Sequence, residues 1–80
     1  MRKADARVAK VFGLLLRESR LAANLTQEAL AHEAEVERTY VSFLERGLRQ
    51  PSLRILLALS GPLRKPAHEL IRELEARLKR

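Results

Sequence analysis

Apolar residues recur along this chain at the three- and four-residue spacing of an α-helix, and turn-forming residues interrupt the pattern repeatedly. The interruptions fall near Asn24, at Glu35-Val36-Glu37, after Gly47 and at Gly61-Pro62. No Asn-Gly or Asp-Gly pair separates alternating apolar runs, so nothing indicates a β-hairpin. The pattern therefore predicts an all-α chain of five helices.

Residues with capping chemistry set the expected ends of these helices. The expected segments are about 6–23, a second after Thr26, a third at about Arg38–Arg46, a fourth after Ser52 and a fifth at about 66–80. Thr26 and Ser52 each offer an N-cap oxygen, and Gly47 suits a C-cap. Gly61-Pro62 is expected to end or kink the fourth helix, because proline lacks an N–H and clashes with the preceding turn. Pro66 is suited to open the fifth helix.

The apolar residues at helical spacing are expected to face one core. They are Val8, Phe12, Leu15 and Leu16, then Leu30, Ala31 and Ala34, then Val41 and Leu44, and finally Leu53, Leu56, Leu57 and Leu59. The fifth helix carries a stripe of its own: Leu70, Ile71, Leu74 and Leu78. That stripe is wide for a terminal helix, so we expect it to form a homodimer interface with help from the end of the fourth helix. The alternative is that it closes the core of the monomer.

The balance of charge indicates the kind of partner. The chain has 80 residues, enough for a single domain over 1–80, and its formal net charge is +6. A strongly basic small domain usually meets a polyanion, most often nucleic acid. Residues 1–5 form the start of a basic arm that also includes Arg7 and Lys10, and the arm is expected to contact the backbone of a nucleic acid or remain solvated.

Several classes of function lack the residues that they require. The chain has no cysteine, and His32 and His68 have no neighbour at ligand spacing, so no metal site is expected. No nucleophile lies beside a base and no Gly-rich phosphate loop is present, so we expect neither an enzyme nor a cofactor. No apolar run approaches the roughly 20 residues of a membrane span. No sensor domain for a small-molecule effector is evident.

The stretch Leu25–Leu53 is the most informative part of the chain. It predicts two short helices joined by a three-residue turn, with Ala31 at their crossing and Val36 closing the turn. The second of these helices would then have an open face made of Arg38, Thr39, Ser42, Phe43 and Arg46. Such a unit can place its second helix in the major groove of DNA.

These residues resemble the Cro/C1-type (Xre) helix-turn-helix family. The resemblance is carried by Arg20, Leu25-Thr26-Gln27-Glu28, Leu30-Ala31, Val36, Val41, Leu44-Glu45-Arg46-Gly47 and Pro51-Ser52-Leu53. It implies a compact five-helix, lambda-repressor-like domain with the helix-turn-helix in helices 2 and 3. Arg38-Thr39-Tyr40-Val41-Ser42 also looks like the recognition helix of restriction–modification controller proteins, which are single-domain dimers. The resemblance further implies a prokaryotic cytoplasm or nucleoid.

Two residues depart from the family pattern. Glu35 stands where the family usually has glycine, so it must adopt a positive φ or change the turn. Glu37 stands where the family usually has serine or threonine, and it is a poorer N-cap. Both departures concern local geometry rather than function.

The open face of the predicted recognition helix supplies the candidate base contacts. Arg38 can pair with guanine O6 and N7, although a solvated or phosphate-bound arginine is the alternative. Thr39 and Ser42 can meet base edges, and Thr39 could equally satisfy a backbone group of the first turn. Phe43 can contact a thymine methyl, or it can fold back onto the core or onto Tyr40.

Other residues are candidates for contact with the DNA backbone. Gln27 lies at a helix N-terminus, which favours a phosphate oxygen, and the resemblance implies the same role; simple capping is the alternative. Arg46, Arg49 and Gln50 are expected to face phosphates, and Tyr40 either reaches a phosphate or packs beside Leu44.

The resemblance also implies a structural ion pair between Arg20 and Glu45, against the alternative of two independent surface charges. Taken together, these features predict a transcriptional regulator that binds symmetric half-sites of a double-stranded operator as a homodimer. A protein-interaction module of the same fold, such as an antitoxin or a transcriptional coactivator, is the alternative.

Overall fold

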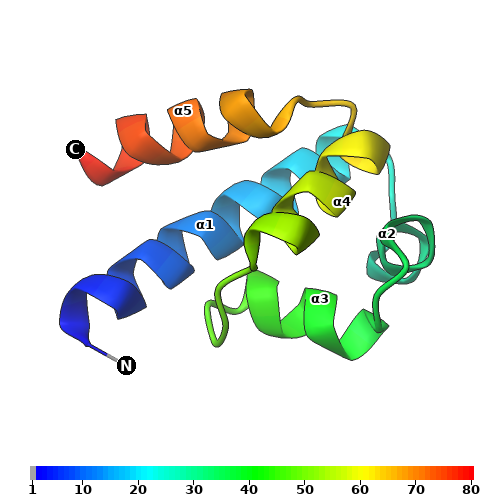
Figure 1. Cartoon of the computed structure of the whole chain (residues 1–80), viewed down its shortest axis with the longest axis horizontal. Coiled ribbons are helices and arrows are strands. Elements are labelled where there is room, and N and C mark those ends of the chain that lie inside the picture. The colour runs from blue at the N-terminus through cyan, green and yellow to red at the C-terminus, as the bar shows by residue number, and fades with distance from the viewer. Residues whose placement is uncertain (1) are drawn as a thin grey trace.

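The protein is an all-α domain of five helices, seen here in a computed structural model that describes residues 2–80. Met1, the first residue of the predicted arm, lies outside the described residues. The helices are α1 (Lys3–Ala22), α2 (Gln27–Ala34), α3 (Arg38–Glu45), α4 (Leu53–Leu63) and α5 (Ala67–Leu78) (Figure 1). The predicted fold class is confirmed, since the described residues contain helices and no strands.

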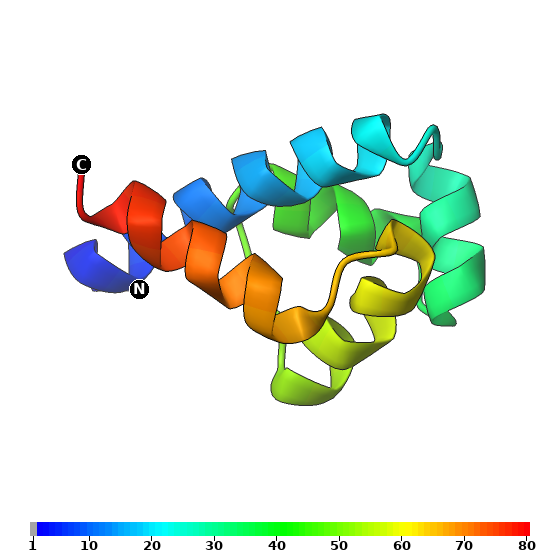
Figure 2. The same cartoon turned by 90° about the horizontal axis from the view of Figure 1, so that it is seen from above.

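The long α1 is the element on which the others pack. In both views α5 runs beside α1, while α2, α3 and α4 gather around its C-terminal half (Figures 1 and 2). The buried core draws on all five helices and consists of Phe12, Leu15, Leu16, Leu30, Ala31, Ala34, Val41, Leu44, Ile55, Leu56, Leu59, Leu63 and Leu70. A chain this short buries a limited apolar surface, so every helix is needed to form one continuous core.

The predicted caps are present. The Thr26 hydroxyl accepts a hydrogen bond from the Ala29 N–H at 3.0 Å, and the Ser52 hydroxyl accepts one from the Ile55 N–H at 3.2 Å. Gly47 has a φ of +73°, the left-handed conformation that follows many helices. These local signals place the starts of α2 and α4 and the end of α3.

Gly61-Pro62 does not end the fourth helix, which was one of the two outcomes expected for this pair. Helix α4 continues through both residues to Leu63, and Arg64 then takes the left-handed conformation. A proline disfavours the helical conformation of the residue before it, partly through that residue's Cβ. Gly61 has no Cβ, so the helix can pass into Pro62 and end one residue later.

The predicted inward face of α4 is also partly wrong. Leu56 and Leu59 are buried as expected, together with Ile55, but Leu53 is 80% exposed and Leu57 is 63% exposed. The four buried positions of α4 follow one helical stripe, and 53 and 57 lie on the opposite side of the helix. Alternative stripes compete in a leucine-rich helix, and the sequence alone did not separate them.

The ends of the chain are more helical than predicted. Helix α1 begins at Lys3, so residues 3–5 of the predicted arm form its first turn. The Arg7 guanidinium donates a hydrogen bond to the Leu78 carbonyl oxygen at 2.8 Å, which joins the start of α1 to the end of α5. The basic residues at the N-terminus therefore project from a helix rather than from an extended arm.

Helix α5 docks on α1 through one buried leucine and one ion pair, and a second ion pair ties α5 to the loop before it. Leu70 is 1% exposed and belongs to the core of the monomer, which corrects its assignment to a dimer interface. Arg77 Nη2 lies 2.6 Å from Glu18 Oε1, and Lys65 Nζ lies 2.8 Å from Glu73 Oε2. The hydrogen bond from Arg77 lowers the pKa of the Glu18 carboxyl below its ordinary value, and the same bond raises the pKa of Arg77.

Candidate nucleic-acid interface

Helices α2 and α3 form a helix-turn-helix. Glu35 adopts φ 58° and ψ 45°, so it takes the left-handed conformation that glycine usually supplies here. The Val36 N–H donates to the Ala31 carbonyl oxygen at 2.9 Å, which closes the turn. Glu37 precedes α3 without a side-chain cap, as its chemistry predicts. Both departures from the family pattern are thus accommodated without loss of the turn.

Helix α3 separates a buried side from an open side. Val41 and Leu44 are fully buried, while Arg38 and Thr39 are exposed and Ser42 is half-buried. The side chains predicted to read bases therefore project from the first two turns of one helix. Their freedom from the core is what a helix lying in a major groove requires.

Gly13 brings α1 against the last turn of α3. A Cβ placed on Gly13 would lie 2.5 Å from the Leu44 carbonyl oxygen and 2.6 Å from that of Glu45. Both atoms belong to the main chain, so no side-chain movement could relieve such contacts. Only glycine permits this approach, and the approach sets where α3 lies relative to α1. In the sequence, this residue is visible only as a glycine inside a helical pattern.

A buried ion pair fixes the same junction. Arg20 Nε donates to Glu45 Oε2 at 2.6 Å, and Arg20 Nη2 donates to Glu45 Oε1 at 3.1 Å. The Arg20 and Glu45 side chains are only 10% and 4% exposed. Arg20 Nη1 also donates to the Leu25 carbonyl oxygen at 2.8 Å, so this guanidinium links α1, the α1–α2 loop and α3.

Hydrogen bonds continue from this pair to the open face. Gln27 Nε2 donates to Glu45 Oε1 at 3.0 Å, and Arg38 Nη1 donates to Gln27 Oε1 at 3.4 Å. The amide of Gln27 is therefore held between a buried carboxylate and an exposed guanidinium. One N–H of its amide group remains for another acceptor.

Phe43 lies beneath two guanidinium groups. The Cζ atom of Arg46 lies 5.3 Å from the centre of the Phe43 ring, and that of Arg49 lies 5.5 Å from it. Cations at this distance are attracted to the negative face of an aromatic ring. The half-buried ring thus gathers two cations at the end of α3, an arrangement that sequence reasoning did not foresee.

The remaining candidates occupy the margins of this face. Tyr40 is half-buried and packs against the core, although part of it stays accessible. Gln50 is exposed, and its Nε2 donates to the Asp5 carbonyl oxygen at 3.2 Å. The site residues therefore meet on one surface around α3, with Gln27 and Arg38 at its start and Arg46 and Arg49 at its end.

The described residues carry no cluster of three or more side chains arranged to hold a metal ion. Within residues 2–80, no helix combines the length and apolar character that crossing a membrane demands.

Comparison with known proteins places this geometry in a family. The helix-turn-helix family model HTH_3 matches residues 16–70. Control protein C.BamHI of Bacillus amyloliquefaciens is 43% identical over 54 residues, which cover 66% of this chain and 67% of that protein. The crystal structure of the restriction–modification controller protein C.AhdI from Aeromonas hydrophila shares 42% identity and a TM-score of 0.75, covering 78% of this chain and 94% of that one.

A second solved structure extends the likeness of the fold to nearly the whole chain. It is the restriction–modification controller protein C.Esp1396I, a tetramer in complex with its natural 35 base-pair operator. The match covers 91% of this chain and 96% of that one, with a TM-score of 0.80 and 23% identity. The family match spans α2, α3 and α4, together with the end of α1 and the start of α5. The chain therefore belongs to the helix-turn-helix family of the Xre/Cro-C1 type, a family of DNA-binding regulators.

Proposed function

We propose that the protein is a transcriptional regulator that binds an operator as a homodimer and controls restriction–modification genes. The observation that carries the proposal is the open side of α3, where Arg38, Thr39 and Ser42 project while the opposite side is buried. The proposed activity is binding alone, without a catalytic step. A protein with this role acts where the DNA is, in the cytoplasm or nucleoid of a prokaryote.

The relatives support the narrower part of the proposal. C.BamHI is a control protein and C.AhdI is a restriction–modification controller, and both share more than two fifths of the aligned residues with this chain. Identity at this level over the helix-turn-helix favours a common kind of target. The net charge of +6 suits that target, since DNA is a polyanion.

The proposed division of labour follows from the geometry. Arg38, Thr39 and Ser42 would read base edges, with the Arg38 guanidinium restrained by Gln27 before DNA arrives. Arg46 and Arg49 would bind phosphates, because the Phe43 ring already gathers them at one end of the helix. Phe43 would then act mainly by holding these arginines, with thymine contact as a second role. Gln27, Tyr40 and Gln50 would complete the backbone contacts.

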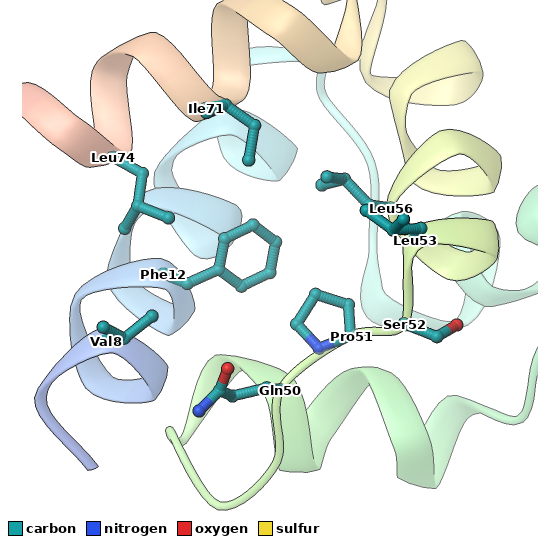
Figure 3. A pocket seen from close by; sticks show the side chains of 9 residues that line it. All are labelled: Val8, Phe12, Gln50, Pro51, Ser52, Leu53, Leu56, Ile71 and Leu74. Atoms are coloured by element: carbon teal, nitrogen blue, oxygen red, sulfur yellow. The ribbon is translucent and has the colours of Figure 1, made fainter. Parts of the chain in front are cut away.

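A dimer interface is proposed on the side where α4 and α5 meet. Ile71 is 38% exposed, Leu74 and Leu78 are half-buried, and the exposed Leu53 and Leu57 extend the apolar surface onto α4. Beside them lies a cavity of about 160 Å³. Figure 3 shows its lining: Val8, Phe12, Gln50, Pro51, Ser52, Leu53, Leu56, Ile71 and Leu74. A two-fold contact would let each copy cover the other's leucines.

The base-reading role is tested with Arg38→Ala. The matched control is Arg49→Ala, which changes an arginine proposed to bind a phosphate instead of a base. Selection of bound DNA from a random pool should return a palindromic site for the wild type. Arg38→Ala should lose about 1–3 kcal/mol on that site and relax the preference at one base pair in each half-site. Arg49→Ala should weaken binding to all sequences alike and reduce the salt slope by about 0.9 for each phosphate that is no longer neutralised. An unchanged selected motif in Arg38→Ala would overturn the assignment of base reading.

The proposed interface is tested by sedimentation of Leu53→Asp and Leu57→Asp. The wild type should sediment as a dimer at micromolar concentration, and both variants should be monomers, because each desolvated leucine contributes about 1.5–3 kcal/mol. Leu21→Asp makes the same change on an exposed leucine of α1 and should remain dimeric. Retention of the dimer by both folded α4 variants would show that the copies meet elsewhere.

A further inference from the structure

The outward face of α1 carries large apolar side chains that no other helix covers. Leu14 and Leu21 lie seven residues apart on this face, and both are more than half exposed. Lys10 and Arg17 lie on the same stripe, each four residues before one of the two leucines. Figure 2 shows α1 along one edge of the molecule, with the other helices on one side of it. We call this surface, together with Leu48, the α1 leucine face.

A groove deepens this face at its N-terminal half. It has a volume of about 480 Å³ and runs between α1 and the loop after α3. Its lining is Ala6, Arg7, Lys10, Val11, Leu14, Arg46, Gly47 and Leu48. Leu48 is more than half exposed, so two leucines flank an apolar floor whose rim carries cations.

The cations of this face have no carboxylate partner among the described residues, although Arg46 lies over the Phe43 ring. None of the ion pairs among residues 2–80 includes Lys10, Arg17 or Arg46. Glu18, the nearest carboxylate along α1 to Leu14, is already paired with Arg77 on the side of α5. The face is therefore both apolar and positively charged, and it requires an occupant with apolar side chains and carboxylates together.

We propose that the α1 leucine face binds an acidic amphipathic helix of a second protein. Residues that repeat every seven positions form the stripe along which two helices pack side by side. An incoming helix with leucine-like side chains seven apart would contact Leu14 and Leu21, and its flanking carboxylates would meet Lys10 and Arg17. The groove beside Leu48 receives one further anchor.

Other occupants fit this surface less well. The DNA backbone offers phosphates but nothing for three exposed leucines. A second copy of the chain offers carboxylates on α2, yet the exposed positions of that helix, Glu28, His32 and Glu33, include no large apolar residue. It also offers carboxylates on α5, but Glu73 is paired with Lys65 and the leucines of that helix are buried or half-buried. Arg46 belongs both to the groove and to the candidate DNA interface, so the bound helix would lie next to the DNA. The proposal does not depend on the dimer or on the identity of the operator.

The test uses a designed peptide as the probe. The peptide is about three heptads long, with leucine at every seventh position and glutamate beside it. Two matched peptides replace its leucines with alanine or its glutamates with lysine. Binding is measured by calorimetry, and the site is located from amide chemical shifts of the full chain. The shifts should centre on Leu14, Leu21 and Leu48, and both matched peptides should bind at least about tenfold more weakly.

Variants of the chain complete the test. Leu14→Gln with Leu21→Gln should weaken binding of the leucine peptide at least about tenfold, while Ala22→Gln, on another side of the same helix, should leave it unchanged. The double variant should keep the melting temperature, the sedimentation and the affinity for duplex DNA of the wild type. If the alanine peptide bound as tightly as the leucine peptide, the binding would depend on charge alone, and the proposal would be overturned. Loss of self-association would instead assign the face to a second copy, and loss of duplex affinity would assign it to DNA.

Discussion

Gly13→Ala is expected to destabilise the protein by about 3 kcal/mol or more, at the upper end of the cost of overpacking a core. The new methyl group would meet the carbonyl oxygens of Leu44 and Glu45 at 2.5 and 2.6 Å. Helices α1 and α3 would have to separate, and their separation would disturb the leucines buried between them. Alanine is otherwise the better helix former by about 1 kcal/mol, so the expected loss is net of that gain.

Thermal and chemical unfolding would measure this loss. For a domain of this size, about 3 kcal/mol corresponds to a fall of roughly 12–24 °C in melting temperature. Arg17→Ala provides the comparison, since it lies exposed on the same helix and should change the stability by less than about 0.5 kcal/mol. A Gly13→Ala protein as stable as the wild type would show that the contact between α1 and α3 yields easily.

Glu45→Ala is expected to cost about 3–5 kcal/mol, because it leaves the buried Arg20 guanidinium without its counter-ion. The same change removes the acceptor that holds Gln27, so the restraint on Arg38 should also be lost. We therefore expect weaker operator binding at temperatures where the variant is still folded. Unfolding in denaturant measures the first effect and duplex titration the second.

A double variant separates the effect of the two charges from the effect of the volume that the two side chains fill. Arg20→Met with Glu45→Leu removes both charges while keeping apolar volume, and it should recover most of the stability lost in Glu45→Ala. Its operator affinity should stay reduced, since Gln27 still lacks its partner. A loss within about 1 kcal/mol for Glu45→Ala would mean that the pair behaves as a surface ion pair.

Local chemistry was sufficient to predict most of the fold. Thr26, Ser52 and Gly47 mark helix ends through their own side chains or through their lack of one, so their signals are visible in the sequence. The misassigned residues depend on distant contacts. Leu53 and Leu57 satisfy the spacing of an inward stripe, but packing of α4 through Ile55 and Leu59 turned them outward. Leu70 was assigned to a dimer because the sequence cannot show how far a terminal helix is covered by its own chain.

The sequence was sufficient to predict which residues form the candidate site, but not the hydrogen bonds and cation–ring contacts that join them. The family resemblance implied the pair of Arg20 with Glu45 and a DNA-backbone role for Gln27, and the helical pattern placed Arg38 on the open face. The chain of hydrogen bonds that joins these four residues depends on side-chain conformations that no spacing specifies. The gathering of Arg46 and Arg49 over Phe43 likewise arises from the course of the loop after Gly47.

The residues that hold α3 in place and the residues that it exposes lie on opposite sides of the helix, so they can evolve separately. The residues that position the helix, Gly13, Arg20 and Glu45, all act from behind it. The exposed Arg38 and Thr39 make no contribution to the core, so exchanging them should cost little stability. On the proposed division of labour, in which these residues read bases, a lineage can acquire a new target by substitutions at the surface of one helix, while the scaffold that carries the helix is inherited unaltered.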